Sequence, residues 1–253
     1  MTDVARVVLV TGASSGIGAA LARRIAGPDT ALMLHARGNA AGLENTVAAV
    51  RDAGSPVAMR QGDFAAPGEG AAVVSVAVES FGRLDQIVAN AGFANRKRFG
   101  EASPAELRHA LAVMTESFFG MVTAALPYLE ASSWGRVVAV SAFGAHSHGS
   151  ADSIFPTTAA AKAAVEALAR ALAWQLAPRG TTVNCVVPGY TRKDAGVHAA
   201  LDPAAWTRAA AAAPMGRLAE PADVAAMIAM LLGRDAGHVT GQSIAVDGGL
   251  SLL

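Results

Sequence analysis

The chain has 253 residues, and 53% of them are hydrophobic, which is enough to bury a sizeable core in one large domain. Its 20 Lys and Arg residues balance its 20 Asp and Glu residues, which argues against nucleic acid or an anionic membrane as the main partner, since both need a basic face. The single cysteine cannot form an internal disulfide, no apolar run reaches the ~20 residues of a membrane span, and no signal-peptide core precedes the first strand. We therefore expect a cytoplasmic protein.

Apolar strand-like runs alternate with helical stretches from one end of the chain to the other. The expected strands cover residues 7–10, 31–35, 57–61, 84–89, 136–141, 182–187 and 243–246. The expected helices cover residues 17–25, 43–52, 71–81, 104–129 (as one helix or two), 158–176 and 221–232. Strict alternation of this kind predicts an α/β fold, in which a single Rossmann-type doubly wound parallel sheet is flanked by helices.

A glycine-rich turn separates the first strand from the first helix. Gly12, Gly16 and Gly18 follow the apolar run 7–10 at G-x3-G-x-G spacing, and an apolar pattern at helical spacing comes directly after them. Glycines allow a tight turn and a close approach of the backbone to a ligand, and a helix N-terminus favours a pyrophosphate. A plain strand–turn–helix corner has the same outline, but the strand before and the helix after favour a dinucleotide site.

The end of the second strand bears on the choice of nucleotide. In dinucleotide-binding folds a carboxylate at this point bonds the ribose hydroxyls of NAD. Here the sequence reads His35-Ala36-Arg37-Gly38, without a carboxylate and with a guanidinium that matches a phosphate. The sequence thus favours NADP(H) over NAD(H), and the alternative is that Arg37 is an ordinary solvated surface residue.

The chain resembles the short-chain dehydrogenase/reductase family from end to end. The matching motifs are T-G-A-S-S-G-I-G at 11–18, Asp63, Asn90-Ala91-Gly92, Lys162 with the three residues after it, Pro188-Gly189, G-R-L at 216–218, Thr240-Gly241 and V-D-G-G at 246–249. The resemblance implies a seven-stranded parallel sheet and usually a homotetramer. It also implies a set of cofactor-binding residues, namely Gly12, Ser14, Ser15, Gly16, Ile17, Gly18, Arg37, Asp63, Phe64, Asn90, Ala91, Gly92, Lys162, Pro188, Gly189 and Thr191.

The resemblance breaks at the catalytic set of the family, which consists of Asn, Ser, Tyr and Lys. Lys162 is present, but Thr158 stands four residues before it, where the family has its proton-donating tyrosine. The enoyl-reductase branch places its tyrosine seven residues before the lysine, and Phe155 is found there. Ala142 stands at the serine position, and Met114 at the asparagine position when counted without a gap. The cofactor determinants therefore persist while three catalytic positions are altered.

Other polar residues are candidates for the missing roles. His146 and His148 lie in the loop after the fifth strand, where ligands bind in open α/β sheets, and histidine titrates near neutrality; the alternative is a pair of exposed loop histidines. Thr158 and Ser141 could bond a substrate oxygen, although Thr158 could equally cap its helix. No third ligand accompanies the H-x-H pair, so we expect no metal.

These observations predict an NADP(H)-dependent oxidoreductase, with Lys162, Thr158, Ser141 and His146 as candidate catalytic residues. It would transfer hydride between the nicotinamide and a small carbonyl or alcohol substrate, with a non-standard proton donor. Two alternatives stay open: a catalytically degenerate cofactor-binding subunit or sensor that partners an active reductase, and a non-redox dehydratase or isomerase in the same pocket. The segment 191–214 is predicted to cover the substrate as a lid, or to pack against the body of the domain. We expect a homotetramer or homodimer, or a hetero-oligomer with a related reductase.

Overall fold

The computed structural model describes residues 4–147, 154–192 and 203–252. Its centre is a sheet of seven parallel strands in the order β3-β2-β1-β4-β5-β6-β7. The strands are β1 (Arg6–Thr11), β2 (Thr30–Ala36), β3 (Val57–Gln61), β4 (Gln86–Ala89), β5 (Arg136–Val140), β6 (Thr182–Pro188) and β7 (Ser243–Val246). The order reverses between β1 and β4, and in open α/β sheets ligands bind outside the carboxyl ends of the strands at such a point. The predicted fold class is confirmed.

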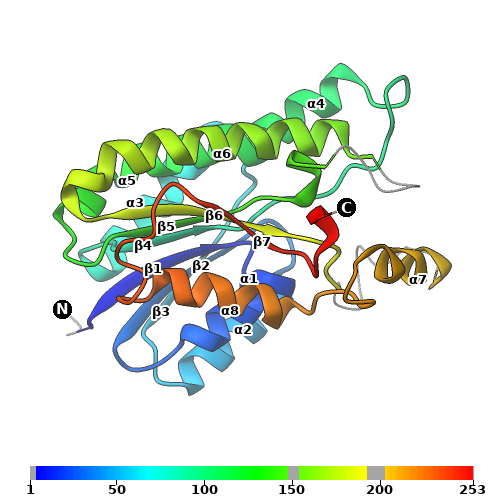
Figure 1. Ribbon diagram of the computed structural model, residues 1–253. Coiled ribbons are helices and arrows are strands. Elements are labelled where there is room, and N and C mark those ends of the chain that lie inside the picture. The colour runs from blue at the N-terminus through cyan, green and yellow to red at the C-terminus, as the bar shows by residue number, and fades with distance from the viewer. Residues whose placement is uncertain (1–3, 148–153, 193–202, 253) are drawn as a thin grey trace.

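Helices cover both faces of the sheet (Figure 1). One layer consists of α1 (Gly16–Ile25), α2 (Ala40–Asp52) and α8 (Pro221–Leu232), and the other of α3 (Glu69–Phe81), α5 (Ser117–Ala131) and α6 (Pro156–Leu176). Two further helices, α4 (Pro104–Ala110) and α7 (Pro203–Ala212), lie beyond the carboxyl edge of the sheet. Each layer packs on one face of the sheet, so the hydrophobic core consists of two halves on opposite faces.

The first strand shows why its sequence is apolar without interruption. Val7 and Leu9 point into the core half beneath α3, α5 and α6, whereas Val8 and Val10 point into the half beneath α1, α2 and α8. Successive side chains of a strand face opposite sides, so a strand buried on both faces needs apolar residues at every position. All four side chains are fully buried.

The stretch expected as one or two helices is a continuous helical segment with a π-helical turn, Leu111–Glu116, between α4 and α5. By length and composition alone, this segment, Pro104–Ala131, could cross a membrane, because an 18-residue window within it has a mean hydropathy of 1.4. However, 44% of that window is buried inside the protein. Glu106, Arg108 and Glu116 interrupt the segment, so it is not an uninterrupted apolar run. Phe118, Met121 and Leu129 lie fully buried in the core, as in a core helix of a globular domain.

Candidate functional site

The turn between β1 and α1 is tightly packed at Gly12 and Gly18 but has free space beside Gly16. Gly12 has φ +67° and Gly16 has φ +54°, a left-handed conformation that favours glycine. A Cβ on Gly12 would lie 2.8 Å from Asn90 Nδ2, and one on Gly18 would overlap the Gly12 carbonyl oxygen, whereas a Cβ on Gly16 would meet nothing within 4 Å. A pyrophosphate fits such a cradle, with the N-terminus of α1 facing it.

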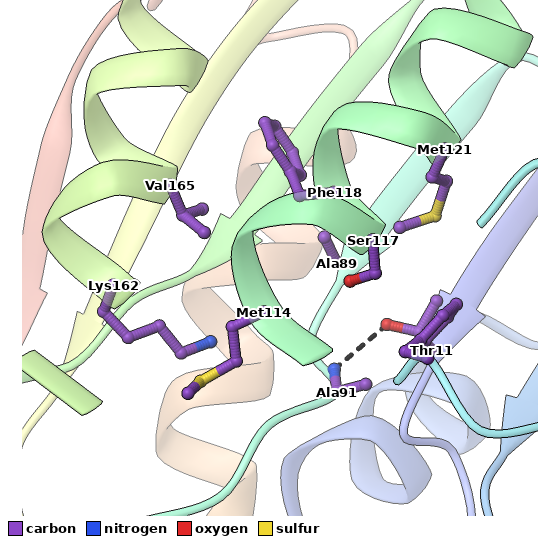
Figure 2. A pocket seen from close by; sticks show the side chains of 10 residues that line it. Thr11, Ala89, Ala91, Met114, Ser117, Phe118, Met121, Lys162 and Val165 are labelled. Atoms are coloured by element: carbon purple, nitrogen blue, oxygen red, sulfur yellow. Dashed lines mark hydrogen bonds between the residues drawn. The ribbon is translucent and has the colours of Figure 1, made fainter. Parts of the chain in front are cut away.

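The end of β4 is tied to this turn. Asn90 Nδ2 donates to the carbonyl oxygens of Thr11 and Gly12 at 2.9 and 3.3 Å. The Thr11 hydroxyl accepts hydrogen bonds from the backbone N–H groups of Asn90 and Ala91, both at 3.0 Å, the second of which is drawn in Figure 2. These bonds hold the two strand ends on either side of the reversal in a fixed relation.

The ends of β2 and β3 carry the residues expected at the adenosine half of a nucleotide. His35 is buried, Nε2 lies 3.0 Å from the Gly62 carbonyl oxygen, and its ring stacks on Phe64 with centroids 4.2 Å apart. Burial lowers the pKa of His35, so the ring is neutral at physiological pH. Asp63 is exposed, and its Oδ1 accepts from the Ala65 N–H at 2.9 Å. Arg37 follows β2 as an exposed residue, where its guanidinium can meet a ligand phosphate.

Lys162 lies buried beside the carboxyl end of β5. Its Nζ donates to the Val140 carbonyl oxygen at 2.6 Å, and the residue is 6% exposed. Burial lowers the pKa of the Lys162 ammonium to about 8, because the charged form loses its hydration. A cavity of about 10 Å³ opens beside it, and Figure 2 shows the lysine extending toward Met114 across this space. A Cβ on Gly92 would lie 3.2 Å from Nζ, so any larger residue there would press against the ammonium.

Thr158 lies one helical turn before Lys162, but its hydroxyl is already bonded. Oγ1 accepts from the Asn95 N–H at 2.9 Å and donates to the Phe93 carbonyl oxygen at 3.4 Å. The helix begins at Pro156 with Phe155 as its N-cap, so the alternative that Thr158 caps the helix was wrong. The hydroxyl instead holds the loop that follows β4 against α6.

Ser141 and His146 both contact a residue that the sequence reasoning missed, Glu166. The Ser141 hydroxyl donates to Glu166 Oε1, and His146 Nε2 lies 2.9 Å from the same oxygen. Ser243 of β7 donates to Oε2 at 2.7 Å, and Arg170 approaches that oxygen at 3.7 Å. The structure thus brings Ser141 and His146 together at Glu166, on the side of α6 that faces β7.

The sequence does contain a pattern that marks Glu166 as a buried carboxylate. It is 2% exposed and stands four residues after Lys162, in an alanine-rich helix whose neighbouring positions are apolar. A carboxylate on the buried face of a helix needs hydrogen-bond donors, because an unpaired buried charge is costly. That rule predicts partners without saying which residues supply them.

The remaining predicted residues lie at the ends of β6 and β7. Pro188 ends β6, and the Thr191 hydroxyl donates to the Gly189 carbonyl oxygen at 3.1 Å. Met215 N donates to the Gly248 carbonyl oxygen at 3.1 Å, so the end of the predicted lid packs on the turn after β7. His148 and residues 193–202 of the lid lie outside the described residues. Within the part of the chain that the structure describes, no cluster of three or more His, Cys, Asp or Glu residues could hold a metal ion.

Known proteins resemble the chain over nearly its whole length. The family described as Enoyl-(Acyl carrier protein) reductase matches residues 12–251. The cis-4-hydroxycyclohexanecarboxylate dehydrogenase of Sinomonas cyclohexanicum is 37% identical over 251 residues, covering 98% of this chain and 97% of the relative. The 3beta-hydroxysteroid dehydrogenase 1 of Eggerthella lenta is 32% identical, covering 98% and 94%. A short-chain dehydrogenase of Burkholderia cenocepacia J2315, solved in complex with NADP, has a TM-score of 0.88 at 29% identity, covering 99% of each chain.

Proposed function

Because the chain belongs to the short-chain dehydrogenase/reductase family, we propose that it is an NADP(H)-dependent oxidoreductase whose proton donor differs from the tyrosine of the family. The observation that carries this proposal is the intact glycine cradle together with a buried Lys162, beside a threonine in the tyrosine position. The bound nicotinamide would supply or accept the hydride. The named relatives act on hydroxyl groups of cyclic compounds, which supports a small secondary alcohol or ketone as substrate.

Each half of the cofactor has residues suited to hold it. The cradle of Gly12, Gly16 and Gly18 would receive the pyrophosphate. The carboxylate of Asp63 would bond the adenine amine, and Arg37 would pair with the phosphate on the adenosine ribose. The remaining predicted contacts, to the ribose and carboxamide of the nicotinamide half, come from Asn90, Ala91, Gly92, Lys162, Pro188, Gly189 and Thr191.

Arg37→Glu tests the preference for NADP(H). We expect the Kd for NADPH to rise about 100-fold, because a charge-assisted bond to the phosphate is replaced by repulsion, whereas the Kd for NADH should change little. Calorimetric titration of both dinucleotides measures the two effects. Arg51→Glu, the same charge change at an exposed position in the last turn of α2, is the matched control. Equal losses of NADPH and NADH affinity in Arg37→Glu would contradict the assignment.

Turnover of the purified chain tests the oxidoreductase itself. Oxidation of NADPH with a panel of cyclic ketones, and reduction of NADP⁺ with the matching alcohols, should proceed without a second protein. A cofactor-binding subunit that partners an active reductase is the second candidate, favoured by Thr158 and Ala142 at the tyrosine and serine positions. Tight NADPH binding without turnover, together with co-purification of a related reductase, would support that candidate.

A further inference from the structure

The proposed function leaves open which group exchanges a proton with the substrate oxygen. Thr158 is a poor source, because an aliphatic hydroxyl is a far weaker acid than a phenol and this one already donates to Phe93. His146 directs Nε2 at Glu166 rather than at Lys162. Of the ten described residues that line the small cavity, Lys162 is the one with an ionisable side chain. The Lys162 ammonium is therefore the remaining proton source beside the cavity.

We propose that Lys162 is itself the proton donor and acceptor for the substrate oxygen, an inference that rests on the proposed function. An ammonium has three N–H donors, and among the described residues Lys162 bonds through one of them, to the Val140 carbonyl oxygen. The other two remain for a ligand. Gly92, whose Cβ position lies 3.2 Å from Nζ, is exposed, so the ligand side of the site begins directly beside the ammonium.

The proton balance of the reaction is simple. In the reductive direction the carbonyl carbon accepts hydride from the reduced nicotinamide dinucleotide, and the π electron pair moves to the carbonyl oxygen. That oxygen takes a proton from the Lys162 ammonium, which leaves a neutral amine that regains its proton from water. Oxidation of the alcohol runs through the same transfers in reverse, with the neutral amine as the base.

The surroundings of Lys162 make both protonation states accessible near neutral pH. Burial lowers the pKa of the ammonium to about 8, and the Glu166 carboxylate on the same helix opposes this shift. Cys185 on β6 is the other titratable group near the ammonium. Burial raises the pKa of the Cys185 thiol to about 12, so that group is neutral at working pH. The residues that face Nζ from the ends of β4 and β5 and from the π-helical turn are uncharged, namely Gly92, Val140 and Met114.

The lysine content of the chain allows a direct test without cofactor. There are three lysines, Lys97, Lys162 and Lys193, so protein labelled with ¹³C at lysine Cε gives three signals. The signal that disappears in Lys162→Arg should titrate with a midpoint near the pKa of about 8, while Lys97→Arg and Lys193→Arg identify the other two. A midpoint above about 10, the ordinary value for lysine, would overturn the inference, because the ammonium would then hold its proton throughout the working range.

The variant Lys162→Arg distinguishes a role of Lys162 in proton transfer from a role in cofactor binding. Arginine keeps the positive charge but does not release a proton in proteins. We expect the Kd for NADPH to stay within a few-fold of the wild-type value while kcat falls about 10²- to 10⁴-fold. Lys162→Met should lose both affinity and turnover. Wild-type kcat in Lys162→Arg would overturn the inference and leave the proposed function intact, whereas failure of the wild-type protein to bind NADPH would count against the proposed function alone.

Discussion

Replacing Thr158 by tyrosine should raise kcat by up to about 10²-fold, the lower end of what a general acid contributes, because Lys162 already exchanges a proton with the substrate oxygen. The variant returns a phenol to the position one helical turn before Lys162. A phenol has a pKa near 10, which a neighbouring ammonium lowers further, so it gives up its proton more readily than the threonine hydroxyl. Steady-state rates of NADPH oxidation with the same ketone, for wild type and variant, measure the gain.

Two controls show whether the gain comes from the phenol. Thr158→Val has nearly the same shape as threonine but loses the bonds to Asn95 and Phe93, so it should cost about 1 kcal/mol of stability without raising kcat. Thr158→Tyr combined with Ala142→Ser should raise kcat further, because a serine hydroxyl is then placed after β5. A folded Thr158→Tyr that binds NADPH but turns over no faster than wild type would contradict the expectation that a phenol at this position adds to the proton transfer by Lys162.

The sequence predicts the features of the site that depend on residues close together in the chain. The glycine turn is recognisable because a buried strand, three glycines and a helix follow one another within 20 residues of chain. The inner strands, such as β1, β2 and β6, are recognisable for a similar reason, since burial on both faces favours nearly continuous apolar runs. Even the position of Thr158 relative to Lys162 follows from the pitch of one helix.

The hydrogen-bond partners of the candidate catalytic residues could not be predicted in the same way. Thr158 bonds a loop more than 60 residues away in the chain. Glu166 bonds a serine that follows β5, a serine of β7 and a loop histidine. Such contacts depend on the order of the strands in the sheet and on how α6 lies across them. A sequence pattern shows that a buried polar group needs partners, but only the tertiary structure shows which ones it has.

Replacing Glu166 by alanine should lower the free energy of unfolding by about 3 kcal/mol. The Ser141 and Ser243 hydroxyls would lose their acceptor, at a cost of about 1–3 kcal/mol for each buried group left unsatisfied, and the removed side chain would leave a cavity. The loop at His146 would also lose the contact between Nε2 and Glu166. Urea denaturation at pH 7 measures the change through a shift of the midpoint at constant slope.

Glu166→Gln is the matched variant, because glutamine keeps the length of the side chain and one carbonyl acceptor while it removes the charge. We expect it to lose less than half as much stability as Glu166→Ala, since Ser141 or Ser243 can still donate to the amide oxygen. Equal stability of the alanine variant and wild type would mean that the cost of burying the carboxylate cancels its hydrogen bonds. Glu166 would then hold Ser141 and His146 in place without contributing to stability, and the loss of Glu166 should alter NADPH oxidation only if one of those two residues contacts the substrate.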